Sequence, residues 1–127
     1  MARYLSVVEN AYRATVEEQD DTAVWFTHAL KNGGADVALL LRGNAVNYAL
    51  RGQDASGLRF GTKELKVPPE IGKDIAACME KKIPVFVVSE DVVERGIPAG
   101  DLLPGIEKIA RSGLAQLFDS HDRMIHW

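Results

Sequence analysis

Short apolar runs alternate with longer amphipathic segments along the chain. Three runs are continuous and rich in aliphatic residues: RYLSVV at 3–8, ADVALLLR at 35–42 and VFVV at 85–88. Such runs predict strands that are buried on both faces, as in a parallel sheet. GIEKI at 105–109 and RMIHW at 123–127 are predicted as two shorter strands.

The segments between these runs carry helix signals. Asp20 and Asp21 are both suitable N-caps for the first helix, and Gly33–Gly34 is a suitable end for it. Ser112 is expected to cap the last helix. The predicted helices are 22–32, 43–52, 70–82 (opened by Pro68–Pro69), 90–95 and 112–121. Strands that alternate with helices predict an α/β fold over 1–127, a single-domain three-layer sandwich with a mostly parallel, flavodoxin-like five-stranded sheet.

The segment 53–69, QDASGLRFGTKELKVPP, is too long for a simple connection, so we expect it to form an excursion or to meet a partner. Two segments offer surface beyond what a single domain needs for its own packing: the stretch from Gly52 to Val67 and the apolar end at Ile125–Trp127. We therefore expect a homo-oligomer, which would be a dimer, a trimer or a hexamer.

Composition narrows the function classes. The net charge of −3 and the absence of a Lys/Arg stripe argue against nucleic-acid binding. The apolar runs fall far short of the ~20 residues of a membrane span, so we expect no membrane partner. The N-terminus has no signal-peptide pattern, and we expect a cytoplasmic location. A single cysteine, Cys78, excludes an internal disulfide and a cysteine-rich zinc site.

The motifs of common cofactor and metal sites are missing from the sequence. His28, His121 and His126 fit no ligand spacing, and His28 is expected on the polar face of its helix. No phosphate-binding glycine motif and no G-x-S-x-G elbow is present. We therefore expect neither a metal nor a cofactor.

Polar residues follow the predicted strands, and ligands of open α/β sheets bind at the carboxyl ends of strands. Tyr12, Arg13, His126 and Trp127 also lie at or near strand ends. The candidate ligand-binding residues are Glu9, Asn10, Arg42, Gly43, Asn44, Ser89, Glu90 and Asp91.

Most of these candidates also have a structural interpretation. Ser89 and Asn44 are preferred N-caps, and Glu90 and Asp91 would complement a helix dipole. Gly43 permits a turn. Arg42 is either a surface charge or, beside a helix start, part of an anion site.

Cys78 belongs to an apolar stripe. Ile71, Ile75, Cys78 and Met79 share one helix face, which predicts a buried, inert thiol with a raised pKa. A reactive thiol would need a place near a helix N-terminus, whereas Cys78 lies in the C-terminal half of its helix.

Over nearly the whole chain the sequence resembles the DsrE/DsrF-like family, which includes the TusD-type sulfur relay subunits. The similar segments are the first strand, ADVALLLR with GNAVNYAL, the helix before IPVFVV, VVERGI and LFDSHDRMIHW. The resemblance implies a five-stranded sheet, oligomers, sulfur-relay partners and a persulfide-carrying cysteine at the end of the strand before the RG[IV] helix end. Aligned on Arg95-Gly96-Ile97, that position falls at Val88, with Ser89 beside it.

Three hypotheses follow. The leading one is a sulfur-relay-type protein without the persulfide cysteine, acting as a binding or oligomeric partner, because Glu90 and Asp91 would disfavour a thiolate at that helix start. The second is a sulfur carrier or sulfurtransferase that uses Cys78 as its catalytic thiol. The third is a module in which Arg42 and Asn44 bind a small anionic ligand.

Overall fold

The computed structural model describes residues 2–11, 21–53, 57, 59–64 and 70–127. Tyr12, Arg13, Asp20 and Pro68–Pro69, all named in the sequence predictions, lie outside the described residues.

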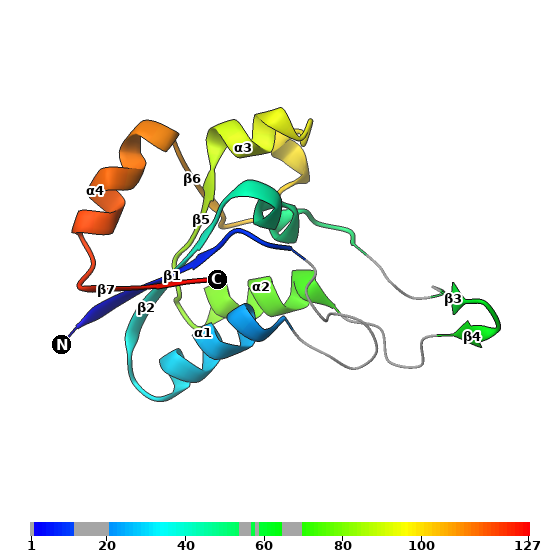
Figure 1. Cartoon of the computed structure of the whole chain (residues 1–127), viewed down its shortest axis with the longest axis horizontal. Helices are drawn as coiled ribbons and strands as arrows, with labels where there is room; N and C mark the ends of the chain where they lie inside the picture. The colour runs from blue at the N-terminus through cyan, green and yellow to red at the C-terminus, as the bar shows by residue number, and fades with distance from the viewer. Residues whose placement is uncertain (1, 12–20, 54–56, 58, 65–69) are drawn as a thin grey trace.

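Within these described residues, five strands form one sheet in the order β6-β5-β2-β1-β7, and every neighbouring pair is parallel (Figure 1). The predicted α/β fold with a five-stranded sheet is therefore confirmed. Continuous apolar runs form the central strands because both of their faces are buried. The strands are β1 (Arg3–Val8), β2 (Asp36–Leu41), β5 (Val85–Val88), β6 (Glu107–Ile109) and β7 (Arg123–His126).

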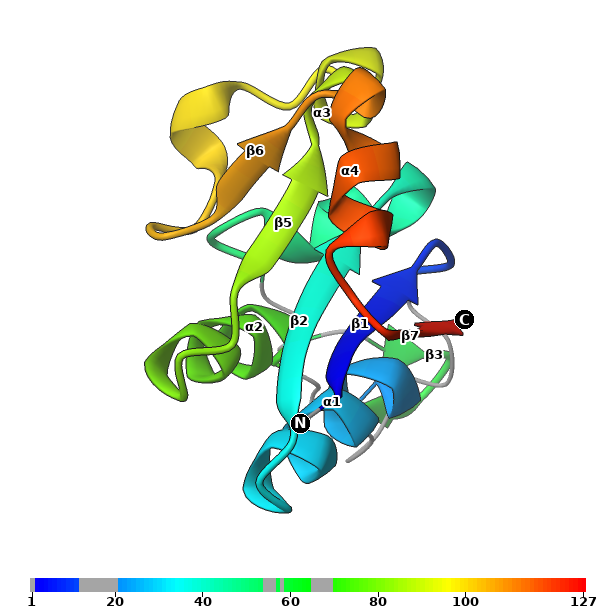
Figure 2. The same cartoon turned by 90° about the vertical axis from the view of Figure 1, so that its left-hand side faces the viewer.

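Helices cover both faces of the sheet. The larger apolar cluster includes residues of β1, β2 and β5 together with residues of four helical segments, α1 (Thr22–Asn32), the 3-10 helix η1 (Gly43–Ala49), α2 (Ile71–Glu80) and α3 (Ser89–Glu94). The smaller cluster on the opposite face includes Leu114 of α4 (Leu114–Asp119). Figure 2 shows α4 lying in front of the sheet, with α1 and α2 behind and below it.

The first helix begins as the sequence predicts. Asp21 is almost fully buried, and its Oδ1 accepts hydrogen bonds from the N–H groups of Ala23 at 2.9 Å and Val24 at 3.2 Å. The Tyr48 hydroxyl donates to the other carboxylate oxygen. Asp21 therefore caps α1 and also joins it to η1.

Two predicted helices differ from the structure. The segment expected to be helical over 43–52 is the 3-10 helix η1, which ends at Ala49. Ser112 does not cap the last helix, because it lies in a 3-10 turn, η3 (Arg111–Gly113), and α4 begins only at Leu114. Ala45, Val46, Tyr48 and Ala49 of η1 are buried in the core, and 3-10 helices are common in short connecting segments of this kind.

Within the expected excursion, residues 59–64 form an antiparallel hairpin, β3 (Arg59–Phe60) and β4 (Lys63–Glu64), whose residues are all exposed. A further 3-10 turn, η2 (Ala99–Asp101), follows α3. No helix in the described part of the chain is long and apolar enough to cross a membrane.

Candidate functional site

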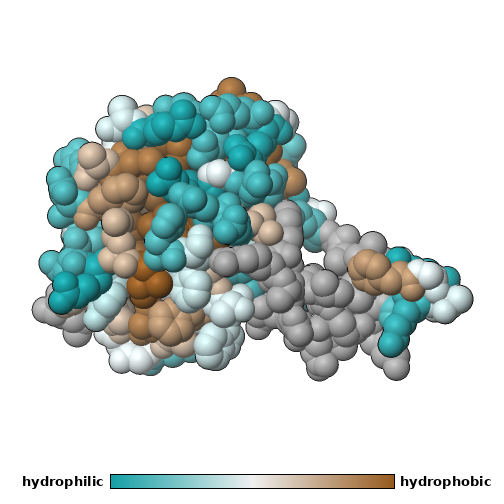
Figure 3. Space-filling view, in the orientation of Figure 1, coloured by the Kyte–Doolittle hydropathy of each residue, from teal (hydrophilic) through white to brown (hydrophobic). Residues whose placement is uncertain are grey.

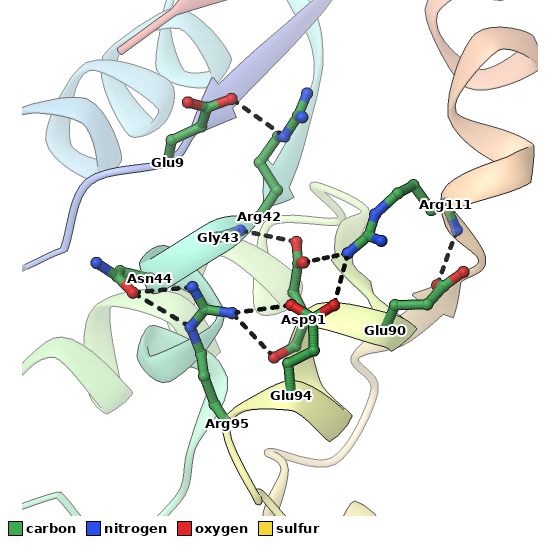
Figure 4. Close-up of polar contacts among 9 residues, drawn as sticks. All are labelled: Glu9, Arg42, Gly43, Asn44, Glu90, Asp91, Glu94, Arg95 and Arg111. Atoms are coloured by element: carbon green, nitrogen blue, oxygen red, sulfur yellow. Dashed lines mark hydrogen bonds and ion pairs between the residues drawn. The ribbon is translucent and has the colours of Figure 1, made fainter.

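Polar residues from four strand ends lie near one another at the carboxyl edge of the sheet, and hydrogen bonds and ion pairs join them in two sets, one around Asp91 and one formed by Glu9 and Arg42 (Figure 4). This cluster includes most of the predicted residues and two further arginines. Its members are Glu9, Arg42, Gly43, Asn44, Glu90, Asp91, Glu94, Arg95 and Arg111. Asn10 is exposed beside Glu9, and Ser89 is half-buried at the start of α3. Ligand binding by these residues stays a prediction.

Asp91 is the centre of the cluster. Its side chain is only 12% exposed, its Oδ2 accepts the Gly43 N–H at 2.8 Å, and its Oδ1 accepts Arg111 Nη2 at 2.7 Å. Burial raises the pKa of Asp91, but the bonds from Gly43 and Arg111 outweigh it, so this pKa lies below its usual value. The carboxylate therefore joins the segments that follow β2, β5 and β6.

Gly43 forms the turn that follows β2. Its φ of 57° lies in the left-handed region, where a side chain would be strained. The turn directs the Gly43 N–H at Asp91, and it lets the Ala45 N–H donate to the Glu9 carbonyl at 3.1 Å. The interpretation of Gly43 as a turn residue is confirmed.

Arg111 contacts two acidic residues of α3 in addition to Asp91. Its backbone N–H donates to Glu90 Oε1 at 2.9 Å, and this bond lowers the pKa of Glu90. Its Nη2 lies 3.4 Å from Glu94 Oε1. The sequence analysis missed Arg111, although it stands two residues after β6 and the rule that selected the other strand ends would have found it.

The ion pair of Asp91 and Arg111 lies at the topological switch point of the sheet, where the connections of two adjacent strands, β5 and β6, leave toward opposite faces. After β5 the chain passes to the face of the larger apolar cluster, where Val92 is buried, whereas after β6 it passes to the opposite face, where Leu114 is buried. Ligands of open α/β sheets bind where adjacent connections diverge in this way. Here the protein's own carboxylate and guanidinium groups occupy that place.

Two predicted N-caps are wrong. Asn44 makes no cap bond, because its Oδ1 accepts Arg95 Nη2 at 2.9 Å and Nε at 3.2 Å. Ser89 is the first residue of α3, and Val88 stands at the cap position without a side-chain bond. Capping statistics therefore did not predict the role of Asn44, whose side chain binds Arg95 from a distant segment.

A second group of side chains lies at the ends of β7, β1 and β2. Glu9 Oε1 is 3.1 Å from Arg42 Nε and 3.1 Å from His126 Nε2. These side chains are between one third and three fifths exposed, and all three residues stand at strand ends that the sequence analysis singled out.

Cys78 lies on α2, away from the strand ends, and it is 0% exposed. Burial raises the pKa of its thiol to about 12, and the charge of Asp74 adds to the effect. The predicted burial of Cys78 is confirmed; a catalytic role for it stays a prediction.

The sequence analysis placed His28 on the polar face of its helix, and this prediction is wrong. The side chain is half-buried between α1 and α2. Its Nε2 lies 3.0 Å from the Asp74 carbonyl oxygen and 3.2 Å from Cys78 Sγ. A carbonyl only accepts, so Nε2 carries the proton, and the buried Nδ1 has no partner in the described structure. Within the same part of the chain, no three His, Cys, Asp or Glu residues are placed to hold a metal.

No protein-family model matches the sequence, and no curated protein matches it either. Several solved structures are similar, and two of them match over 100% of both chains. The ychN protein from E. coli has a TM-score of 0.75 at 21% identity. A protein of unknown function from Methanobacterium thermoautotrophicum, MTH1491, has a TM-score of 0.61 at 13% identity. At these identities the likeness establishes the fold, and the chain therefore has the fold of the ychN protein.

Proposed function

We propose that this protein is a DsrE-like member of the intracellular sulfur-relay type that acts as a non-catalytic binding or oligomeric partner. The resemblance in sequence supports the sulfur-relay context, and the ychN-like fold over the whole chain is consistent with it. The observation that carries the non-catalytic role is the end of β5, where the family's cysteine position holds Val88 and Ser89.

The surroundings of that position are unfavourable for a sulfur-carrying thiolate. Val88 is completely buried in the smaller apolar cluster, so a side chain there cannot meet a donor without rearrangement. Glu90 and Asp91 follow directly, and the positive charge of Arg111 is already paired with Asp91. A thiolate needs unpaired positive charge nearby, and this strand end offers carboxylates instead.

The alternative of Cys78 as a sulfur carrier is disfavoured by its burial. A thiol with a pKa of about 12 is almost wholly protonated at neutral pH, and the thiolate is the form that attacks sulfur donors. The half-buried His28 does not correct this, because its Nε2 proton is directed at the Asp74 carbonyl.

Sulfur loading tests the proposal. Folded protein is treated with a small-molecule persulfide donor, and its intact mass is recorded beside that of the Cys78→Ser variant. We expect no sulfur adduct on the folded protein, and an adduct on wild-type protein that is unfolded in urea during the treatment. An adduct on the folded wild type that is absent from Cys78→Ser would refute the non-catalytic role.

Homo-oligomer formation and a cytoplasmic location are part of the same proposal. On the face drawn in Figure 3, apolar side chains form a band between α4 and α1. Met124 of the edge strand β7 is 53% exposed, and Leu117, Phe118 and Trp127 are only partly buried. Surface of this kind is typical of subunit interfaces. Sedimentation at micromolar concentration tests this part, and a monomer would contradict it.

A further inference from the structure

The side chains of Glu9, Arg42 and His126 form a row across three adjacent strands. Val7 pairs with both Leu40 and His126 in the sheet register. Glu9 and Arg42 stand two residues beyond Val7 and Leu40, and residues two apart on a strand share a face. The three polar side chains therefore continue the rows of the sheet face that carries α4.

A single carboxylate oxygen holds this row together. Glu9 Oε1 forms an ion pair with Arg42 Nε at 3.1 Å and lies 3.1 Å from His126 Nε2. Both side chains are thus oriented before any ligand arrives.

Arg42 differs from the other two arginines of the strand ends. Arg95 uses Nε, Nη1 and Nη2 in contacts with Asn44, with the Asp91 carbonyl and with Glu94, and Arg111 binds Asp91 and Glu94. Arg42 makes one ion pair, through Nε, and within the described residues its two Nη groups have no protein partner. Figure 4 shows these groups pointing away from Asp91. Its side chain is 35% exposed, so the groups can be reached from solvent.

We propose that Arg42, oriented by Glu9 and His126, forms a binding site for a small oxyanion, a phosphate or sulfate group. A planar guanidinium with a free pair of Nη groups matches two oxygens of such an anion, and a lysine ammonium does not reproduce this fork. His126 contacts the same Glu9 oxygen from the neighbouring strand, so it helps to hold Glu9, and through Glu9 the Arg42 guanidinium, in place. The inference goes beyond the proposed sulfur-relay role, and it holds or fails independently of sulfur transfer.

The site is tested by titrating the wild-type protein with inorganic phosphate and following backbone amide shifts by NMR, with sodium chloride at matched ionic strength as the salt control. A second arm uses glycerol phosphate: tighter binding than phosphate identifies an ester as the ligand, and weaker binding identifies the free ion. We expect saturable shifts around Glu9, Arg42 and His126. If neither anion gives saturable shifts at millimolar concentration, the site does not exist.

Three variants separate the site from general attraction to positive charge. Arg42→Gln should weaken phosphate binding about tenfold or more, because charge-assisted hydrogen bonds are lost. His126→Gln keeps a donor for Glu9 and should weaken binding severalfold. Arg123→Gln is the matched control, since Arg123 is exposed at the opposite end of β7, and it should bind as the wild type does. Equal affinities of Arg42→Gln and Arg123→Gln would overturn the proposal.

Discussion

Replacing Asp91 by Asn tests whether the charge cluster stabilises the fold. The substitution keeps the shape of the side chain but removes its charge. The new amide can still accept the Gly43 N–H, whereas its NH₂ group would face Arg111. One charge-assisted hydrogen bond is lost as a result, and the Arg111 guanidinium keeps only its longer contact with Glu94.

The expected cost follows from the geometry. Hydrogen bonds to charged groups contribute about 1.5–3 kcal/mol. Arg111 is 51% exposed, so solvent screens the pair and the lower part of this range applies, about 2 kcal/mol. For a domain of this size, 2 kcal/mol corresponds to a fall in Tm of about 7 °C.

The assay is urea unfolding of the wild type and Asp91→Asn between pH 7 and pH 3. Because the folded-state pKa of Asp91 is lowered, its contribution is present above the unfolded pKa of about 3.9 and is lost as pH falls through the folded value. The difference between the proteins should be constant from pH 7 to about 5 and should shrink at lower pH.

Glu70→Gln is the control for this experiment, since Glu70 and Lys73 form an exposed ion pair at 2.8 Å. Exposed pairs contribute little, and we expect a change below about 0.5 kcal/mol. If Asp91→Asn costs no more than this control, or if its cost does not change with pH, the role assigned to Asp91 is wrong.

Three further substitutions test other parts of the structure. Gly43→Ala should cost about 1–2 kcal/mol in urea unfolding because of its positive φ, whereas Gly100→Ala, where φ is ordinary and space is open, should cost much less. Asp21→Ala removes the cap of α1 and the partner of Tyr48, so it should cost about 3 kcal/mol; Asp21→Asn keeps the cap and should cost less. Trp127→Phe loses the indole bond to Ser6 at 3.1 Å and should cost about 1 kcal/mol by thermal unfolding; no loss would show that this bond does not stabilise the chain end.

The main elements could be predicted because local sequence decides them. The first strand and the first helix lie where the apolar run at 3–8 and the amphipathic segment at 22–32 predict them. The cap by Asp21 and the burial of Cys78 could also be predicted. An N-cap bonds only to its own helix, and a buried helix face follows from the spacing of apolar residues along one segment.

The polar contacts could not be predicted in the same way, because they join distant segments. Asn44 meets Arg95, 51 positions later, and Asp91 meets Arg111 across β6. His28 is half-buried because α1 packs beside α2, and periodicity in one helix does not reveal its neighbour. The row of Glu9, Arg42 and His126 depends on the strand order, which places β7 beside β1.

The central claim is that Cys78, the single cysteine of the sequence, is buried in the core and therefore unreactive. The alkylation rate of Cys78 tests this claim most directly. Native and urea-unfolded proteins are treated with iodoacetamide over a series of pH values, and the modified fraction is followed by mass. With a pKa of about 12, the native thiol should react far more slowly than the unfolded one, and its rate should still be rising at the highest pH at which the protein stays folded. A native rate equal to the unfolded rate, with a midpoint near an ordinary thiol pKa, would contradict the account.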